Sequence, residues 1–425
     1  MLLTLIPLFD ENMMVKAYSL FTQRDHYFYN PTHTDEAVER SAEIEGLDII
    51  GSVGAETLVG EDKEIFVTLN PVSLYTPFEE DCKLEPERLV FIIDNTFPTD
   101  SNCIARLQEL KSRGYKLAIR KLEVRQYQQY NQILSMADYM FFDHKKMNIS
   151  SGRLFFTKMF PAIKLCAGNL DSNETFEKLK KEGGYHFFEG PFYRTAITHG
   201  QHEVKPLEVN YIQLLNMVNK NDYDLQGAAE VISRDTALVI SLLKVVNRMA
   251  RNSEIVSIKH AAAMLGQREL RRFINTVVVG EMYSDKPNEI TRLSLLRAKF
   301  AENLAKDFDL ASQSGELFLM GLFSVLDLIL GLPMEEALEK LKLSRDITEV
   351  LTKGTGPFAE LYHFMQDYEN ANWENVDKVI KEKNLGSLEV YKAFTDALEW
   401  YRRLFSRDEE SDDQEKVGAE IIQQD

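Results

Sequence analysis

The stretch Tyr115-Lys-Leu-Ala-Ile119 is a short apolar run that leads directly into Arg120-Lys121-Leu122. It is one of six such runs in the first half of the chain, whose starts lie 23 to 27 residues apart. That spacing fits one strand, one helix and two short loops, and its repetition predicts a parallel sheet, closed as a barrel or open and doubly wound. The runs are Ile65–Leu69, Leu89–Ile93, Lys116–Ile119, Tyr139–Phe142, Ala162–Cys166 and His186–Phe188. Before them, Leu3–Leu8 and Val15–Phe21 predict a hairpin.

The strand that ends at Ile119 is followed by two cations. In repeated β/α folds the functional groups gather where the strands end. A divalent metal at that place would be held by carboxylates, and each Arg or Lys beside it would repel it by about 4 kcal/mol per pair of unit charges at about 4 Å and an effective dielectric constant of about 20. We therefore interpret Arg120 and Lys121 as the mark of a metal site that has lost its ligands.

After about residue 200 the apolar residues follow the spacing of helices. Tyr211, Leu214, Leu215 and Val218, for example, share one helical face. From Arg407 the chain is acidic and polar, which is typical of a disordered tail. We predict a β/α domain over residues 1–200, an all-helical domain over 201–405 and an acidic disordered tail over 406–425, with a linker near 200–206.

Composition excludes several classes of protein. The net charge of −18 and the absence of a long basic stretch argue against direct binding of nucleic acid. Cys82, Cys103 and Cys166 have no CxxC spacing, and the amino terminus lacks the basic region of a signal peptide. The apolar stretch Leu317–Met334 contains Asp327, so we predict a buried core helix there and no membrane span. These observations predict a cytoplasmic protein.

Common catalytic motifs are absent from the sequence. No glycine-rich phosphate loop follows a predicted strand, and there is no G-x-S-x-G or H-E-x-x-H. None of the eight histidines is followed by Asp, the dipeptide that holds metals in HD-type phosphohydrolases. Asp327 needs a hydrogen-bonding partner if it is buried, and we interpret it as structural.

Four stretches of the second half occur in the order and at the spacing of a known domain. They are Lys205-Pro-Leu207, Ile232-Ser-Arg-Asp-Thr-Ala-Leu238, Leu242-Leu-Lys-Val-Val-Asn247 and Ile258-Lys-His-Ala-Ala-Ala-Met-Leu-Gly266. On these residues the block from 204 to 279 resembles an HDOD domain, the non-catalytic relative of the HD phosphohydrolases. In Gly321-Leu-Phe-Ser-Val-Leu-Asp327, Ser324 and Val325 stand where an HD enzyme has its His and Asp. The resemblance therefore implies a degenerate HD position at Ser324, Val325 and Asp327.

The first half resembles the shortened EAL-type barrel that precedes HDOD in bacterial EAL–HDOD signalling proteins. Ile6-Pro-Leu-Phe-Asp10 is similar to that family's opening R-Q-P-I-F-D, and Tyr18-Ser-Leu-Phe-Thr22 is similar to Y-E-L-L-F. Gly190 matches the glycine of the closing F-Q-G. The two resemblances cover residues 1 to about 405 and imply a degenerate, TIM-like EAL barrel followed by an all-helical HDOD bundle.

Active EAL domains hydrolyse cyclic di-GMP with two divalent cations held by carboxylates, and the resemblance implies what stands at those positions here. Ser19 replaces the motif glutamate, Thr68 an asparagine, Asn95 a glutamate, Arg120-Lys121 the paired aspartates and Phe141 a lysine. Asp143 is retained, Asp171 corresponds to a distal glutamate, and Glu189 to the glutamine before Gly190. A two-metal site activates water and neutralises phosphate charge. The replacements therefore imply a protein that is not an enzyme and holds no metal or cofactor.

Two interpretations of the cations stay open. Arg120 and Lys121 either contact an anionic phosphate in place of a metal, or form salt bridges with Asp143 or Asp171 that hold an inactive cleft together. Accordingly, the leading hypothesis is a non-enzymatic signalling scaffold for a partner protein such as a kinase, response regulator or cyclase. The alternative is a metal-independent receptor for cyclic di-GMP or a related nucleotide. Residual phosphodiesterase activity is disfavoured.

Overall fold

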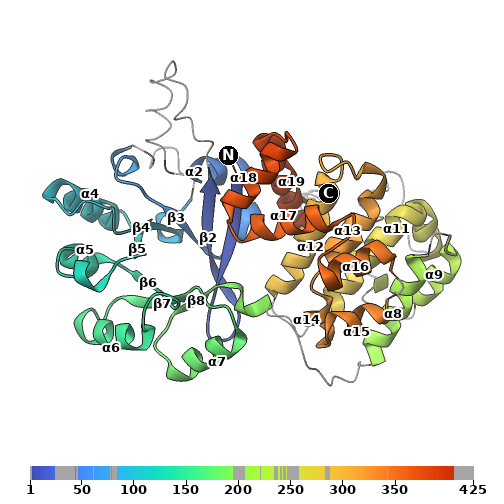
Figure 1. The fold of residues 1–425 in the computed structure, drawn as a ribbon, viewed down its shortest axis with the longest axis horizontal. Helices are drawn as coiled ribbons and strands as arrows, with labels where there is room; N and C mark the ends of the chain where they lie inside the picture. The colour runs from blue at the N-terminus through green and yellow to red at the C-terminus, as the bar shows by residue number, and fades with distance from the viewer. Residues whose placement is uncertain are drawn as a thin grey trace, which may run out of the picture.

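Eight strands close into a barrel in the computed structural model (Figure 1). Strand β1 runs antiparallel to both of its neighbours, β2 and β8, and every other neighbouring pair is parallel. The closed order confirms the predicted barrel and rules out the open, doubly wound sheet. The strands are β1 Leu2–Phe9, β2 Val15–Gln23, β3 Glu64–Thr68, β4 Leu89–Ile93, β5 Lys116–Ile119, β6 Tyr139–Asp143, β7 Lys164–Gly168 and β8 Phe187–Glu189.

The structure describes most of the chain, and some of the predicted features lie outside the described residues. Those features are Cys82, the linker near 200–206 except for Pro206, residues 205, 234–237, 243–245 and 247 of the HDOD-like stretches and the acidic tail over 406–425. The domain boundaries therefore stay predictions. The described residues are 2–23, 44, 46–60, 62–76, 78, 84–194, 206–220, 222–233, 238–239, 242, 246, 258–282, 288–341 and 343–405.

Helices follow strands β2 and β4 to β7 as the spacing predicted, whereas the described residues between β3 and β4 form only the 3₁₀ turns Ser73–Tyr75 and Pro86–Arg88. Three of the helices begin at side chains that cap free backbone N–H groups, namely Asp100, Asn148 and Ser172. The strand predicted over Ala162–Cys166 begins two residues later, at Lys164, because residues 161–163 form the turn that follows the preceding helix. The helices are α2 Leu47–Val53, α3 Ala55–Val59, α4 Ser101–Ser112, α5 Asn131–Met136, α6 Ile149–Met159 and α7 Asn173–Glu182.

The interior of the barrel is filled by apolar and aromatic side chains. Phe66 contacts Tyr139, Phe141 and Phe187, with ring centroids 5.2, 5.7 and 6.2 Å from its own. Smaller residues of neighbouring strands, among them Ala118, complete this cluster. At the amino ends of the strands, Tyr139 donates a hydrogen bond of 2.8 Å to Glu64 Oε2. The barrel therefore encloses a packed core and no channel, as is usual for eight strands.

The second half is helical, as predicted. Leu317–Met334, predicted as one buried helix, is instead broken at Ser324 and Val325 into α13 and α14, both of which are buried. Among the described residues, no helix is long and apolar enough to cross a membrane. The helices are α8 Pro206–Val218, α9 Leu225–Ile232, α11 Ile258–Met282, α12 Asn288–Leu304, α13 Ser314–Phe323, α14 Leu326–Leu330, α15 Met334–Glu339, α16 Arg345–Lys353, α17 Ala359–Glu369, α18 Trp373–Glu382 and α19 Ser387–Phe405.

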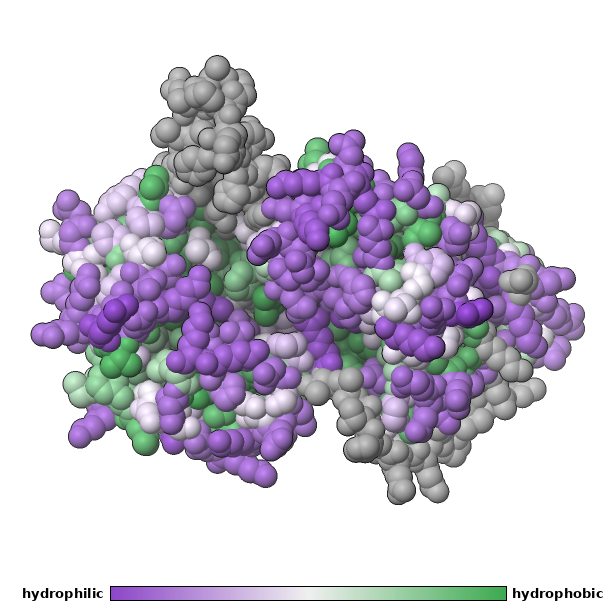
Figure 2. Space-filling model, in the orientation of Figure 1, coloured by the Kyte–Doolittle hydropathy of each residue, from purple (hydrophilic) through white to green (hydrophobic). Residues whose placement is uncertain are grey.

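The helical half packs directly on strand β1. Helices α17 and α19 lie against this strand, and the Leu3 amide donates a hydrogen bond of 3.2 Å to the buried Tyr368 hydroxyl of α17 (Figure 1). Leu3 and Leu5 of β1 belong to the same cluster of buried side chains as Phe394 of α19. The space-filling view shows the two halves in contact along this junction (Figure 2). The barrel and the helices thus share one continuous core.

Gly190 is required where strand β8 ends. Its φ is +141°, and a Cβ atom there would lie 2.2 Å from the Leu170 carbonyl oxygen. We expect Gly190→Ala to lower the free energy of unfolding by at least about 3 kcal/mol, because backbone must move to relieve the overlap. Gly183→Ala is the control: Gly183 has φ +66° but nothing within 4 Å of the added Cβ, so it should cost about 1–2 kcal/mol. Equal losses in urea denaturation would contradict the steric explanation.

Candidate functional site

Arg120 lies across the mouth of the barrel, at the carboxyl ends of the strands. From the end of β5 its guanidinium reaches Glu189 at the end of β8, with a 2.9 Å hydrogen bond from Nη1 to Oε1 and a second, shorter one from Nη2 to Oε2. Nη2 also donates a 3.1 Å hydrogen bond to Ser19 Oγ of β2. Glu189 is 8% exposed and Ser19 is fully buried. Three of the predicted site residues are therefore brought together by one buried ion pair.

Aromatic rings surround the same guanidinium. Its carbon atom lies 4.0 Å from the centroid of Phe141 and 5.6 Å from that of Phe21. Such contacts are attractive because the face of an aromatic ring is electronegative. Below them, burial raises the pKa of the Cys166 thiol above its usual value, so this cysteine stays protonated and unreactive at neutral pH. Arg120 thus covers the packed barrel interior at the carboxyl ends of the strands.

The remaining predicted residues of the mouth lie apart from Arg120. Asp143 accepts hydrogen bonds from the Lys145 amide at 2.9 Å and from Asn169 Nδ2 at 3.1 Å. Asp171 is exposed and lies 3.5 Å from the Lys145 ammonium. The prediction that Asp143 or Asp171 pairs with Arg120 is therefore wrong, because the guanidinium reaches inward to Glu189. Asp143 at the end of β6 and Asp171 in the loop after β7 both contact Lys145 instead.

Three further predicted residues take no part in the ion pair. Lys121 is exposed and has a φ of +57°, and Thr68 at the end of β3 is also exposed. Asn95 is half-buried in the turn after β4.

The residues at the mouth do not fit the two divalent cations of an active EAL domain. Hard divalent cations need several oxygen ligands, chiefly carboxylates, with room around them. In the described part of the chain, no three His, Cys, Asp or Glu side chains gather as a metal site would require. Glu189 already has both oxygens bonded to a fixed guanidinium, which would repel a metal.

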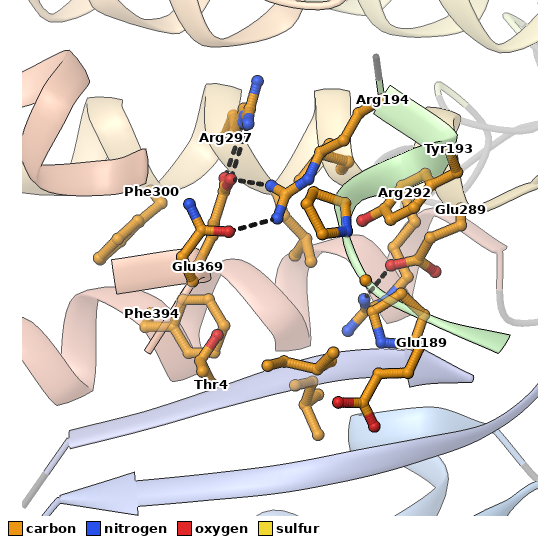
Figure 3. Close-up of a pocket in the computed structure, with 18 of the residues that line it drawn as sticks. Thr4, Glu189, Tyr193, Arg194, Glu289, Arg292, Arg297, Phe300, Glu369 and Phe394 are labelled. Carbon is orange, nitrogen blue, oxygen red and sulfur yellow. Dashed lines mark hydrogen bonds and ion pairs between the residues drawn. The ribbon is translucent and has the colours of Figure 1, made fainter. Parts of the chain in front are cut away.

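A cavity of about 250 Å³ lies between the barrel and the helical half (Figure 3). Its barrel wall includes Thr4 and Leu5 of β1, and Arg194 from the short 3₁₀ turn Pro191–Arg194 after β8. Its other wall includes Arg292 of α12 and Phe394 of α19. Groups from both halves of the chain therefore line one partly open space.

Arg297 occupies the degenerate HD position. Ser324 is buried, donates a hydrogen bond of 2.7 Å to the Gly321 carbonyl oxygen and accepts one of 3.0 Å from Arg297 Nη1. The backbones of α12 and α13 come very close here, because a Cβ on Gly321 would lie 2.4 Å from the carbonyl carbon of Arg297. Val325 and Asp327 are also buried. The predicted degenerate HD position is thus buried and contacts the guanidinium of Arg297.

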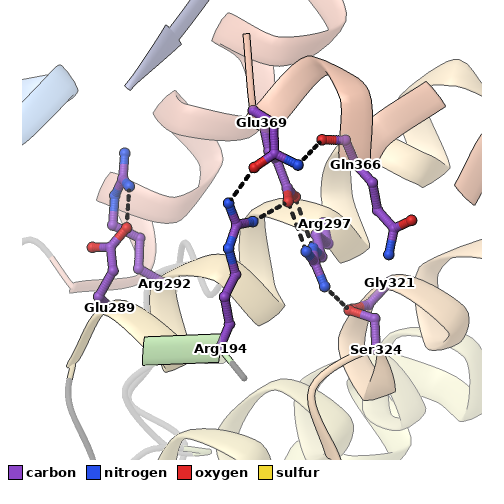
Figure 4. A network of polar contacts seen from close by, with 9 residues as sticks. Arg194, Glu289, Arg292, Arg297, Gly321, Ser324, Gln366 and Glu369 are labelled. Carbon is purple, nitrogen blue, oxygen red and sulfur yellow. Dashed lines mark hydrogen bonds and ion pairs between the residues drawn. The ribbon is translucent and has the colours of Figure 1, made fainter. Parts of the chain in front are cut away.

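The same arginine connects the helical half to the barrel (Figure 4). Arg297 donates hydrogen bonds of 2.7 Å from Nε and from Nη2 to the two carboxylate oxygens of Glu369 on α17. Arg194 donates one of 2.9 Å to Glu369 and another of 2.7 Å to Asn370. Burial raises the pKa of Glu369, but Arg297 and then Arg194 outweigh it and hold that pKa below its usual value of 4.5.

A second polar group crosses the junction beside the first. Tyr18 of β2 donates a hydrogen bond of 2.6 Å to Glu289 Oε2, while Arg292 donates one of 2.9 Å to Oε1. The Arg292 guanidinium also lies 4.7 Å from the centroid of the Tyr18 ring.

Sequence reasoning did not find the residues of this junction. The one available signal was the pair Arg292 and Arg297 in an otherwise apolar helical stretch, since buried arginines require partners.

The comparisons with known proteins agree with this architecture. Residues 205–350 match the HDOD domain family. The chain is 28% identical over 318 residues to cyclic di-GMP phosphodiesterase CdgJ from Vibrio cholerae, covering 73% of this chain and 72% of CdgJ. It is 25% identical over 410 residues to the uncharacterized protein YuxH from Bacillus subtilis, covering 94% of this chain and 97% of YuxH. Residues 205–350 therefore belong to the HDOD family.

The predicted architecture, a barrel followed by an HDOD domain, is thus confirmed. Among solved structures, the YkuI protein of Bacillus subtilis, with an EAL domain and in complex with its substrate cyclic di-GMP and calcium, aligns with 55% of this chain. The alignment covers 72% of the YkuI chain, with a TM-score of 0.36 and 15% identity.

A double-mutant cycle tests the ion pair at the barrel mouth. We expect Arg120→Met to cost about 3 kcal/mol of unfolding free energy, because it leaves the Glu189 carboxylate buried without a counter-charge. Adding Glu189→Leu should recover about 2 kcal/mol of that loss, measured by chemical denaturation. The exposed pair Lys378–Glu382, 4.0 Å apart, is the control and should show coupling below about 0.5 kcal/mol. Additive effects at Arg120 and Glu189 would show that the two side chains do not stabilise each other.

The lowered pKa of Glu369 predicts acid sensitivity. A carboxylate whose pKa is lower in the folded state stabilises the protein above about pH 4.5, and this contribution is lost as the pH falls through the folded pKa. We expect Glu369→Gln to cost about 3 kcal/mol at pH 7. The difference from wild type should shrink between pH 5 and pH 3 in denaturation curves. Glu360→Gln on the exposed side of the same helix is the control, and a difference that stays constant with pH would refute the assignment.

Proposed function

We propose that this chain is a non-enzymatic signalling scaffold, built from an EAL-like barrel without catalytic metals and a metal-free HDOD domain. The observation that carries the proposal is the Arg120–Glu189 ion pair. It takes the place at the barrel mouth where carboxylates would hold metals in an active EAL domain, and its positive charge disfavours a cation there.

The degenerate HD position supports the same conclusion from the other half of the molecule. Arg297 fills the space beside Ser324 and ties it to Glu369 and Arg194. Both places where the family's catalytic relatives hold metals are therefore occupied by an arginine, half-buried at position 120 and buried at position 297. In this scaffold Arg120 fixes strands of the barrel relative to one another, and Arg297 fixes the packing of the two halves.

A protein partner needs a surface, and helix α6 offers one. Leu154, Phe155 and Met159 on this helix are 64%, 42% and 57% exposed. Apolar residues gather around this helix at the lower left of the molecule (Figure 2). Grouped apolar exposure of this kind is typical of protein interaction sites. The proposed partner is a signalling protein of the kinase, response-regulator or cyclase type.

One observation favours a second candidate, a metal-independent receptor for cyclic di-GMP or a related nucleotide. The Nε atom of Arg120 is buried and has no hydrogen-bond partner in the described part of the chain. A phosphate oxygen would satisfy that donor. The relative CdgJ is named as a cyclic di-GMP phosphodiesterase, which makes this nucleotide the one to test.

Titration calorimetry and a hydrolysis assay with cyclic di-GMP, each with and without Mg²⁺ or Mn²⁺, separate these functions. We expect no hydrolysis and no binding heat under either condition. Saturable binding without metal that disappears in Arg120→Met would establish the receptor instead. Metal-dependent hydrolysis would overturn both candidates.

The scaffold also requires a complex that depends on its proposed surface. A partner that binds wild type should be lost on Leu154→Lys and kept on Leu388→Lys, since Leu388 on α19 is 70% exposed but far from α6 in the chain. Loss of the complex in both variants, or in neither, would remove α6 from the proposal.

A further inference from the structure

The cavity between the two halves carries an excess of positive charge. Arg194 and Arg297 share the single carboxylate of Glu369, which leaves one positive charge without a counter-charge in that group. The other charged side chains of the wall are paired one to one, such as Arg292 with Glu289. Glu189 is paired with Arg120, and Lys145 is paired with Asp171; both of these partners lie outside the cavity. The wall as a whole is therefore suited to one negative charge.

Arg292 provides a donor that the protein leaves unused. The residue is 8% exposed, and its Nη2 is buried with no hydrogen-bond partner among the residues that the structure describes. Nη1 is bonded to Glu289, and the flat face of the guanidinium lies over the Tyr18 ring. Because buried polar groups in folded proteins nearly always have partners, an orphaned guanidinium donor beside a cavity indicates a missing acceptor. Figure 3 shows Arg292 at the barrel side of this space, beside Glu289 and near Glu189.

The rest of the wall is apolar. Leu5 and Pro7 come from β1, Leu296 and Phe300 from α12, and Phe394 from α19. A volume of about 250 Å³ is slightly below the range of about 300–1,000 Å³ that is typical of ligand pockets. The cavity is thus too small for a cyclic dinucleotide with its two purines and two phosphates. It has room for a small molecule with one polar end.

We propose that this cavity binds a small organic monocarboxylate, whose carboxylate accepts from Arg292 Nη2, whose charge is balanced by the excess positive charge of the wall, and whose apolar body packs on Leu296, Phe300 and Phe394. Carboxylates match the geometry of guanidinium groups. A phosphate monoester carries nearly two charges at neutral pH, more than the single excess charge of this wall. The ligand would contact both the barrel and the HDOD domain, so its binding stabilises their docked arrangement. This site is separate from the barrel mouth and does not depend on whether the barrel is catalytic.

Binding to the full-length wild-type chain is the first test. The probes are benzoate, its neutral isostere benzamide and the doubly charged phenyl phosphate, titrated by calorimetry. We expect benzoate to bind saturably and at least 10-fold more tightly than either of the others. Benzoate should also slow amide hydrogen exchange in β1 and α12. No binding of benzoate, equal binding of benzamide, or tighter binding of phenyl phosphate would overturn the proposal.

Variants locate the site. The double variant Arg292→Met/Glu289→Gln removes the donor without leaving a buried charge, and Gln can still accept from Tyr18; we expect it to weaken benzoate binding at least 10-fold. Leu296→Phe fills part of the cavity and should also weaken benzoate binding at least 10-fold. This variant tests the location of the site if the double variant does not fold. Arg345→Met/Glu349→Gln, an exposed pair 3.9 Å apart, is the matched control and should change the affinity less than twofold. Wild-type affinity in a folded Arg292→Met/Glu289→Gln and in Leu296→Phe would place binding elsewhere and refute the assignment.

Discussion

Strand β1 belongs to both halves of this molecule, and the arrangement of the rest depends on it. On its edges it pairs with β2 and β8 and so closes the barrel. On one face it is covered by α17 and α19, where the Leu3 amide and the Tyr368 hydroxyl form a buried hydrogen bond. An uncovered apolar face of this strand would be exposed to water, so the helical half completes the core of the barrel. This constraint brings Arg194, at the end of the barrel, next to Glu369.

Arginine has the same role at each of the two degenerate sites. At the barrel mouth Arg120 binds a carboxylate of another strand, and at the HD position Arg297 binds a carboxylate of another helix. A buried ion pair of this kind contributes little net stability compared with apolar packing, but it tolerates few alternative arrangements. The planar guanidinium, with donors along its edge and aromatic rings on its face, fixes the relative positions of the elements that it joins. At both predicted degenerate sites the arginine therefore joins separate elements of the fold.

The sequence predicted the fold better than the site. Regular spacing of apolar runs located the barrel strands, because each β/α unit is a local pattern of strand, turn and helix. The antiparallel pairing of β1 with β8 joins residues at opposite ends of the barrel sequence and leaves no local pattern. For the same reason Arg120 was assigned the wrong partners: Asp143 and Asp171 follow nearby strands, whereas Glu189 lies 69 residues away in the chain. The junction residues Arg194, Glu289, Arg292, Arg297 and Glu369 were missed, since their contacts depend on how two distant halves pack.

The contact between Leu3 and Tyr368 joins residues 365 positions apart, and it has a consequence for synthesis of the chain. A ribosome releases β1 first, but the strand β8 that closes the barrel beside it and the helices that cover it come much later. Until α17 and α19 have emerged, the apolar face of β1 is open to other strands and to chaperones. The barrel sheet can close once β8 has been made, but the outer face of β1 stays uncovered until the helices follow. Strand β1, which has eight residues, is made before the other barrel strands but is among the last to acquire all of its neighbours.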